Sequence, residues 1–247
     1  PQEEIISTGI NECDLVLGKG LVNGSVVLLG GDPGIGKSTL SIQLCQNISQ
    51  KGLKVLYVTA EESAEHIRAR AERVGSLNNN IWVYTESNMA CILDQLDTLN
   101  PDLVLLDSIQ VVHHPDCSGI EGSVSQVRYC ANMLLSWVKS SHKMGIIIGH
   151  ITKDGQLAGP KTLEHLVDVI LYIEGDKQLH YRILRCYKNR YSTTHEIGLF
   201  EMKKEGLTEI TQPSKLFIES ATLNQPGSII APISEGNRII LIELQAL

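Results

Sequence analysis

The fold of this 247-residue chain is decided by the segment Gly31-Asp32-Pro33-Gly34-Ile35-Gly36-Lys37-Ser38-Thr39. It fits the pattern G-x-x-x-x-G-K-[ST], in which backbone N–H groups cradle phosphates, the lysine reaches the β- and γ-phosphates, and the hydroxyl binds Mg²⁺. The apolar run 26–29 predicts a buried strand before it, and apolar residues at 40, 44 and 48 predict a helix after it. This order places a helix N-terminus against a bound polyanion. We therefore expect the whole segment to bind a nucleotide.

Outward from this loop, predicted strands alternate with predicted helices. Residues 5–23 predict a first strand, a short helix and a turn. Further strands are expected at 54–59, 81–84, 103–107 and 145–149, and helices at 64–74, 88–99 and 123–142. Four more strands follow without helices between them, at 167–174, 180–187, 195–202 and 206–210. The first pattern predicts an α/β fold with a mainly parallel, twisted sheet, and the second predicts antiparallel strands at one edge.

The composition excludes several classes of protein. No apolar run approaches the ~20 residues of a membrane span, and the first residues, 1–4, lack the basic and apolar regions of a signal peptide. We expect a cytoplasmic protein with no membrane partner. Six scattered cysteines predict reduced thiols, and the run 113–117 predicts a polar loop rather than a metal site. The net charge of −7 does not exclude nucleic acid, because a ring can concentrate its basic residues in a central channel.

Carboxylates stand at the ends of two predicted strands. Asp107 ends an apolar strand about 70 residues after the phosphate loop, from where a carboxylate holds the Mg²⁺ shell through water. Glu61 and Glu62 follow another strand, and strand ends line the ligand site in an open α/β sheet. We favour Glu61 as the group that polarises the attacking water. The alternative is that both glutamates are first-turn helix residues stabilised by the helix dipole.

Two other groups have open roles. His150 ends the fifth predicted strand, where it either senses the γ-phosphate or is satisfied locally. Lys188 and Arg190 flank Asn189 at the end of a late strand, so both cations project to the same side. They suit either insertion into a neighbouring subunit's nucleotide site or an exposed hairpin made soluble by charge.

Together, these motifs resemble the bacterial RadA (Sms) family of RecA-like ATPases. The resemblance covers most of residues 5–247 and includes Tyr57-Val58-Thr59-Ala60-Glu61-Glu62-Ser63, Gly149-His150-Ile151-Thr152-Lys153-Asp154-Gly155 and Lys188-Asn189-Arg190-Tyr191. It implies a homo-hexameric ring that uses ATP and Mg²⁺, moves along single-stranded DNA and promotes branch migration of recombination intermediates. It also implies a RecA-type recombinase as a partner.

The resemblance assigns roles to particular residues. Lys37, Ser38 and Thr39 bind nucleotide and Mg²⁺, Asp107 supports the metal, and Glu61 activates water. The family signature K-N-R-F-G stands here as Lys-Asn-Arg-Tyr-Ser at 188–192, so Lys188 and Arg190 become the cations delivered to the adjacent subunit. The loops 111–122 and 151–162 face the DNA channel, and the DNA-binding residues are Lys153, Lys161 and Arg128.

The chain also departs from the family pattern. Tyr191 and Ser192 replace Phe and Gly of the signature, and the family's N-terminal four-cysteine zinc module is absent. We expect residues 1–210 to form the ATPase domain and residues 211–247 to open a Lon-protease-like domain. Two other functions stay open: an ATP-dependent switch or kinase that acts on a protein partner, and a recombination mediator that binds ATP only as a clamp.

Overall fold

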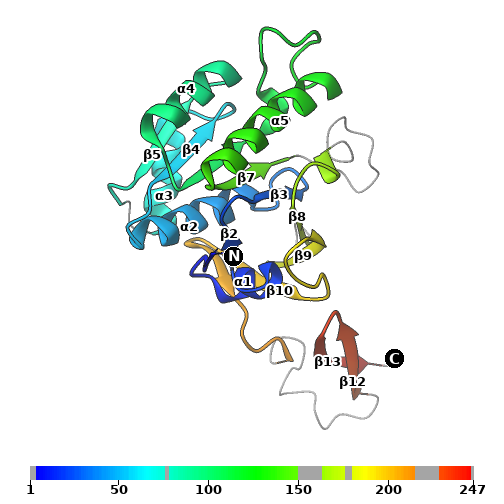
Figure 1. The fold of residues 1–247 in the computed structure, drawn as a ribbon. Coiled ribbons are helices and arrows are strands. Elements are labelled where there is room, and N and C mark those ends of the chain that lie inside the picture. The colour runs from blue at the N-terminus through cyan, green and yellow to red at the C-terminus, as the bar shows by residue number, and fades with distance from the viewer. Residues whose placement is uncertain (1–3, 76–77, 150–162, 176–179, 215–227, 246–247) are drawn as a thin grey trace.

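The computed structural model describes residues 4–75, 78–149, 163–175, 180–214 and 228–245. The central sheet of this part of the chain has nine strands. They are β3 (Val26–Gly31), β4 (Val55–Thr59), β5 (Ile81–Thr85), β6 (Leu103–Asp107), β7 (Met144–Ile148), β8 (Val169–Glu174), β9 (Tyr181–Asn189), β10 (Ile197–Lys203) and β11 (Gly206–Glu209). Their order across the sheet is β11-β10-β9-β8-β3-β7-β6-β4-β5, which puts the strand before the phosphate loop at the centre (Figure 1).

The strand directions confirm the predicted fold class. The six strands from β8 across to β5 pair in parallel with their neighbours. The other three, β9, β10 and β11, continue the sheet in antiparallel pairs. Strands β3, β4, β6 and β7 are buried along their whole length, because helices cover both faces of a parallel sheet.

Five α-helices surround the sheet in the described residues. They are α1 (Asn11–Leu17), α2 (Lys37–Gln50), α3 (Ala64–Val74), α4 (Met89–Leu99) and α5 (Val124–Ser141), and a 3₁₀ turn η1 (Ile109–Val111) follows β6. Helices α4 and α5 pack on one face, and α1, α2 and α3 pack on the other (Figure 1). Ser63, Asn88 and Ser123 cap α3, α4 and α5 by accepting a backbone N–H.

Two small antiparallel pairs complete the structure. Strand β1 (Ile5–Ile6) pairs with β2 (Leu21–Val22), where the sequence predicted a turn; a two-residue strand is too short to show a period. The hairpin of β12 (Ser228–Glu235) and β13 (Arg238–Gln245) contacts the rest of the chain through Ile240, which packs with residues of β10, and through Arg238, which pairs with Glu12 of α1 at 2.9 Å. The predicted domain boundary after residue 210 stays a prediction. Among the described helices, none is long and apolar enough to cross a membrane.

Candidate nucleotide site

The candidate site lies where several parallel strands end at the same edge of the sheet. Gly31, the last residue of β3, pairs with Ile173 near the end of β8. Asp107, the last residue of β6, pairs with Thr59, the last residue of β4. Because these strands run in the same direction, the phosphate loop, Asp107 and the residues after Thr59 lie along one edge.

The phosphate loop packs on one side and is open on the other. A side chain at Gly36, where φ is 119°, would place its Cβ 2.6 Å from Cε of Met202 on β10. A side chain at Gly34, where φ is 77°, would meet nothing within 4 Å in the described residues. Ile35, between these glycines, buries its side chain in the core. The covered side of the loop therefore faces the late strands, and the open side is free for a ligand.

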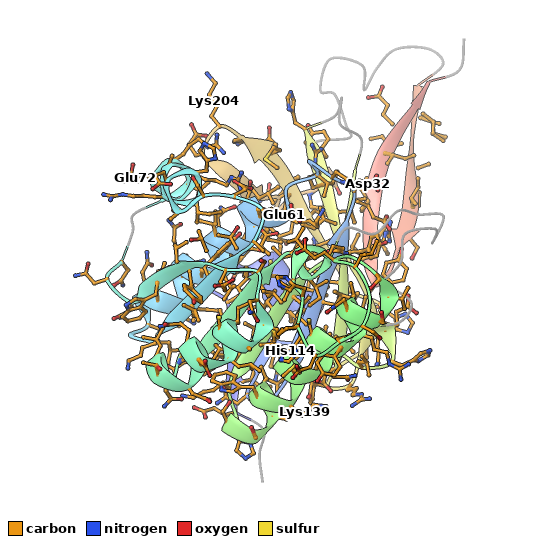
Figure 2. The ribbon with its side chains drawn as sticks, turned by 90° about the horizontal axis from the view of Figure 1, so that it is seen from above. Asp32, Glu61, Glu72, His114, Lys139 and Lys204 are labelled. Carbon is orange, nitrogen blue, oxygen red and sulfur yellow. The ribbon has the colours of Figure 1, made fainter. Side chains whose placement is uncertain are left out.

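The start of α2 provides donors and a cation for an anion. The helix has Gly36 as its N-cap residue, with no side-chain hydrogen bond to its first N–H groups in the described structure. Lys37 is buried, and its Nζ donates to the carbonyl oxygens of Gly31 at 2.8 Å and Asp32 at 3.0 Å. Burial lowers the pKa of Lys37, and the charges of Asp107, Glu61 and Asp32 oppose this shift (Figure 2 labels the last two). Phosphate oxygens would replace these carbonyls as partners of the ammonium group.

The structure brings the two predicted Mg²⁺ residues together. Asp107 is 5% exposed, its carboxylate accepts a hydrogen bond from the Tyr57 hydroxyl at 2.7 Å, and the Ser38 side chain lies close enough to lower its pKa. Burial raises the pKa of Asp107, the Tyr57 and Ser38 side chains lower it, and the charges of Glu61 and Glu62 raise it.

A hydroxyl beside a carboxylate fits Mg²⁺ held together with phosphate oxygens and water. Within the described ranges, no cluster of three or more His, Cys, Asp or Glu could hold a metal.

The two glutamates after β4 have different surroundings. Glu61 accepts a hydrogen bond from the Ser108 hydroxyl, so it lies beside the end of β6. Glu62 forms an ion pair with Arg70 of α3 at 2.8 Å. Helix α3 begins only at Ala64, so the alternative that both glutamates belong to its first turn is wrong. Glu61 therefore lies at the site together with Asp107, and its role in activating water stays a prediction.

Three residues that contact this site were missed in the sequence. The Tyr57 hydroxyl donates a hydrogen bond to Asp107, and the Ser108 hydroxyl donates one to Glu61. Arg182 of β9 donates from Nε to the Ile35 carbonyl at 3.0 Å. Each lies in or beside a strand, and although Tyr57 stands within a family motif, no role at the site was predicted for any of the three. Strand register brings them to the site, and register is not visible in a local pattern.

Lys188 and Arg190 lie at the other end of the strands, beside the first residues of β8 and β3. Asn189 pairs with Val169, which pairs with Val27, four residues before Gly31. At ~3.3 Å per residue, that is about 13 Å along the strands from the phosphate loop. The structure does not bring these cations to the chain's own site.

Contacts with residues 164–168 hold the two cations in place. Lys188 Nζ donates to the carbonyls of Glu164 and Val167, both at 2.7 Å. Arg190 Nη1 bonds the buried carboxylate of Asp168 at 3.0 Å. Both side chains therefore project toward the same segment, as the alternation along a strand predicted.

The predicted DNA-binding residues are only partly described. Lys153 and Lys161 lie outside the described residues, and so does His150, the predicted sensor of the γ-phosphate. Arg128 is exposed on α5, the helix that follows the loop 112–123. Gln126 fixes this loop: its Oε1 accepts the N–H of His114 at 2.9 Å, and its Nε2 donates to the Cys117 carbonyl at 2.7 Å.

The sheet order, the phosphate loop and the Ser38–Asp107 pair define a P-loop ATPase domain of the RecA fold. A family model described as "ATPase: KaiC" matches residues 6–214, and the chain belongs to this family of KaiC-like ATPases. Similar curated proteins are named DNA repair protein RadA, which confirms the resemblance to that family. The chain is 47% identical to the one from Streptococcus pyogenes serotype M6 over 97% of its length and 53% of the relative's.

Two other relatives agree. RadA of Streptococcus pneumoniae (strain R6) is 48% identical over 97% of this chain and 57% of its own length. RadA of Bacillus subtilis (strain 168) is 45% identical over 100% of this chain and 54% of its own length. The chain thus spans about half the length of these relatives.

Proposed function

We propose that this chain is the ATP-hydrolysing part of a DNA repair and recombination motor. It works as a homo-hexameric ring on single-stranded DNA, promotes branch migration of recombination intermediates, and acts beside a RecA-type recombinase. The relatives named DNA repair protein RadA support the DNA role. One observation carries the proposal: the phosphate loop lies at one end of the parallel strands, and Lys188 and Arg190 lie at the other end.

In a head-to-tail ring, one surface of each subunit contacts a different surface of the next subunit. In this arrangement, the phosphate loop, Asp107 and Glu61 of one subunit face Lys188 and Arg190 of its neighbour. Cations at that place stabilise the charge on the transferring phosphoryl group. Asp168 holds Arg190 ready for this role, because its carboxylate is buried and also accepts the Val26 N–H at 3.1 Å. Hydrolysis would then depend on assembly.

DNA contacts belong to the parts of the ring that face its channel. We place Lys153 and Lys161 of the loop 151–162, and Arg128 of α5, against DNA phosphates. Such contacts release counterions, so binding weakens steeply as salt rises. Residues 211–247 open a Lon-protease-like second domain in this proposal.

The first test measures ATP hydrolysis with and without single-stranded DNA, at two salt concentrations between about 50 and 200 mM. We expect DNA to stimulate the rate, and the stimulation to fall at the higher salt. No stimulation at either salt, together with phosphate transferred to a protein, would instead support a switch or kinase. Full recombination activity in a Lys37→Ala variant would support an ATP clamp without hydrolysis.

The second test asks whether Arg190 acts on a neighbour. Arg190→Ala should bind nucleotide and hydrolyse none, and mixing it with Lys37→Ala should restore part of the rate, because each variant supplies what the other lacks. Arg68→Ala is the matched control, since Arg68 is exposed and pairs with Glu72 one turn away on α3. Absence of complementation at every mixing ratio would exclude action in trans.

A further inference from the structure

Arg182 contacts the phosphate loop from a strand far away in the sequence. It lies at the start of β9, is 6% exposed, and donates from Nε to the carbonyl oxygen of Ile35 at 3.0 Å. Its side of β9 also carries Leu184 and Cys186, which pack in the same core as Ile35. The guanidinium group therefore reaches the loop from its covered side.

The Ile35 carbonyl shares a peptide plane with the Gly36 N–H. In a planar trans peptide, the C=O and N–H bonds point in opposite directions. Holding the carbonyl toward β9 therefore turns the Gly36 N–H toward the opposite side of the loop. Gly34 shows that this opposite side is open, because a side chain there would meet no described atom within 4 Å.

Met202 closes the covered side beside Arg182. Its Cε lies where a side chain at Gly36 would have to go, 2.6 Å from the ideal Cβ position. Packing alone would leave the peptide free to rotate, since a methyl group does not distinguish C=O from N–H. A directional hydrogen bond does distinguish them.

We infer that Arg182 is a positioning residue of the nucleotide site: it holds the Ile35 carbonyl so that the Gly36 N–H points at a bound phosphate. The inference rests on the proposed nucleotide site and deepens it. Because backbone N–H groups of a P-loop bind phosphates common to ATP and ADP, Arg182 acts on the affinity for both nucleotides. It does not act on the chemical step.

The test compares substitutions of Arg182 that keep or remove a hydrogen-bond donor at the ε position. In Arg182→Gln, Nε2 stands where the arginine Nε stood, so the donor to Ile35 is kept and the charge is lost. In Arg182→Met, a methyl group stands there and the donor is lost as well. Arg182→Lys keeps the charge but places a methylene at that position. Arg185→Met is the matched control, because Arg185 lies on the other face of β9 and pairs with Glu174.

The readouts are the Kd of MgADP, measured with a fluorescent ADP analogue, the KM and kcat for ATP, and the Tm without nucleotide. We expect Arg182→Met to raise Kd and KM about tenfold or more, with kcat within about twofold. Arg182→Gln and Arg185→Met should keep Kd within about threefold of the wild-type value. If Arg182→Met does not fold, the comparison of Gln with Lys carries the test, and Gln should bind more tightly.

Three results would overturn the inference. Kd values unchanged in Arg182→Met, with a lowered Tm, would mean a structural role only. Tight binding in Arg182→Lys with weak binding in Arg182→Gln would mean that the charge acts on the phosphates directly. A wild-type chain that binds no MgADP would overturn the nucleotide site itself and this inference with it, and this outcome is distinct from the first two.

Discussion

The Tyr57 hydroxyl is the group whose removal tests the site most directly. Tyr57→Phe deletes the donor that lies 2.7 Å from Oδ2 of Asp107 and keeps the ring, which is 1% exposed. A hydrogen bond to a charged group contributes about 1.5–3 kcal/mol. At roughly 2–4 °C per kcal/mol for a chain of this size, the Tm should fall by about 3–12 °C.

The same change should alter the pH dependence of ATP hydrolysis. The Tyr57 hydrogen bond lowers the pKa of Asp107 by favouring the carboxylate, so its loss raises that pKa further. The proposed role of Asp107 at Mg²⁺ requires the carboxylate. As the solution is acidified, Tyr57→Phe should therefore lose ATP hydrolysis at a higher pH than the wild type. A higher Mg²⁺ concentration should partly restore the rate of the variant.

The assays are thermal unfolding without nucleotide and pH–rate profiles at two Mg²⁺ concentrations. Tyr84→Phe is the control, because Tyr84 lies on the neighbouring strand β5, where it pairs with Val58, and its hydroxyl makes no hydrogen bond to a described residue. If the two variants have the same Tm and lose activity at the same acidic pH, the Tyr57–Asp107 hydrogen bond contributes neither to stability nor to hydrolysis, and the reasoning is refuted.

Three further predictions follow from burial and backbone geometry. Because burial raises the pKa of Asp107 above its unfolded value, the carboxylate lowers stability at neutral pH; this cost decreases as the pH falls through the folded pKa and is gone below the unfolded pKa. Asp107→Asn should therefore raise the Tm of the nucleotide-free chain, and it should abolish hydrolysis. Gly36→Ala should destabilise the chain more than Gly34→Ala. Both glycines have positive φ, but only a side chain at Gly36 would meet a packed side chain, that of Met202. Urea unfolding and the Kd of MgADP measure the two effects. Asp168→Ala should lower the free energy of unfolding by about 1–3 kcal/mol, because it leaves the buried Val26 N–H of β3 without its side-chain acceptor. Arg190 is half-exposed, so Arg190→Ala should change the free energy of unfolding by less than about 1 kcal/mol. Equal effects of the two substitutions would contradict this prediction.

Much of the fold could be predicted from local patterns. The buried apolar runs, the helical periods and the helix caps act within a few residues of the chain, so strands such as β6 and helices such as α3 were located closely. The site residues at strand ends followed for the same reason, because parallel strands end at one edge. Asp107 and Glu61 could be named before the strand order was known.

The rest depended on pairing between distant segments. The place of β9 in the sheet and its register decide that Arg182 reaches the phosphate loop while Lys188 and Arg190 lie at the far edge. Likewise, the pairing of β4 with β6 decides that Tyr57 meets Asp107.

The sequence by itself determined that a nucleotide loop stands between a central strand and a helix, since that information lies in consecutive residues. Only the tertiary structure decided which side chains support this loop and which are kept from it. The physical reason is that a shift of one residue in strand register turns every side chain to the other face, and the strands whose pairing fixes this register lie far apart in the sequence.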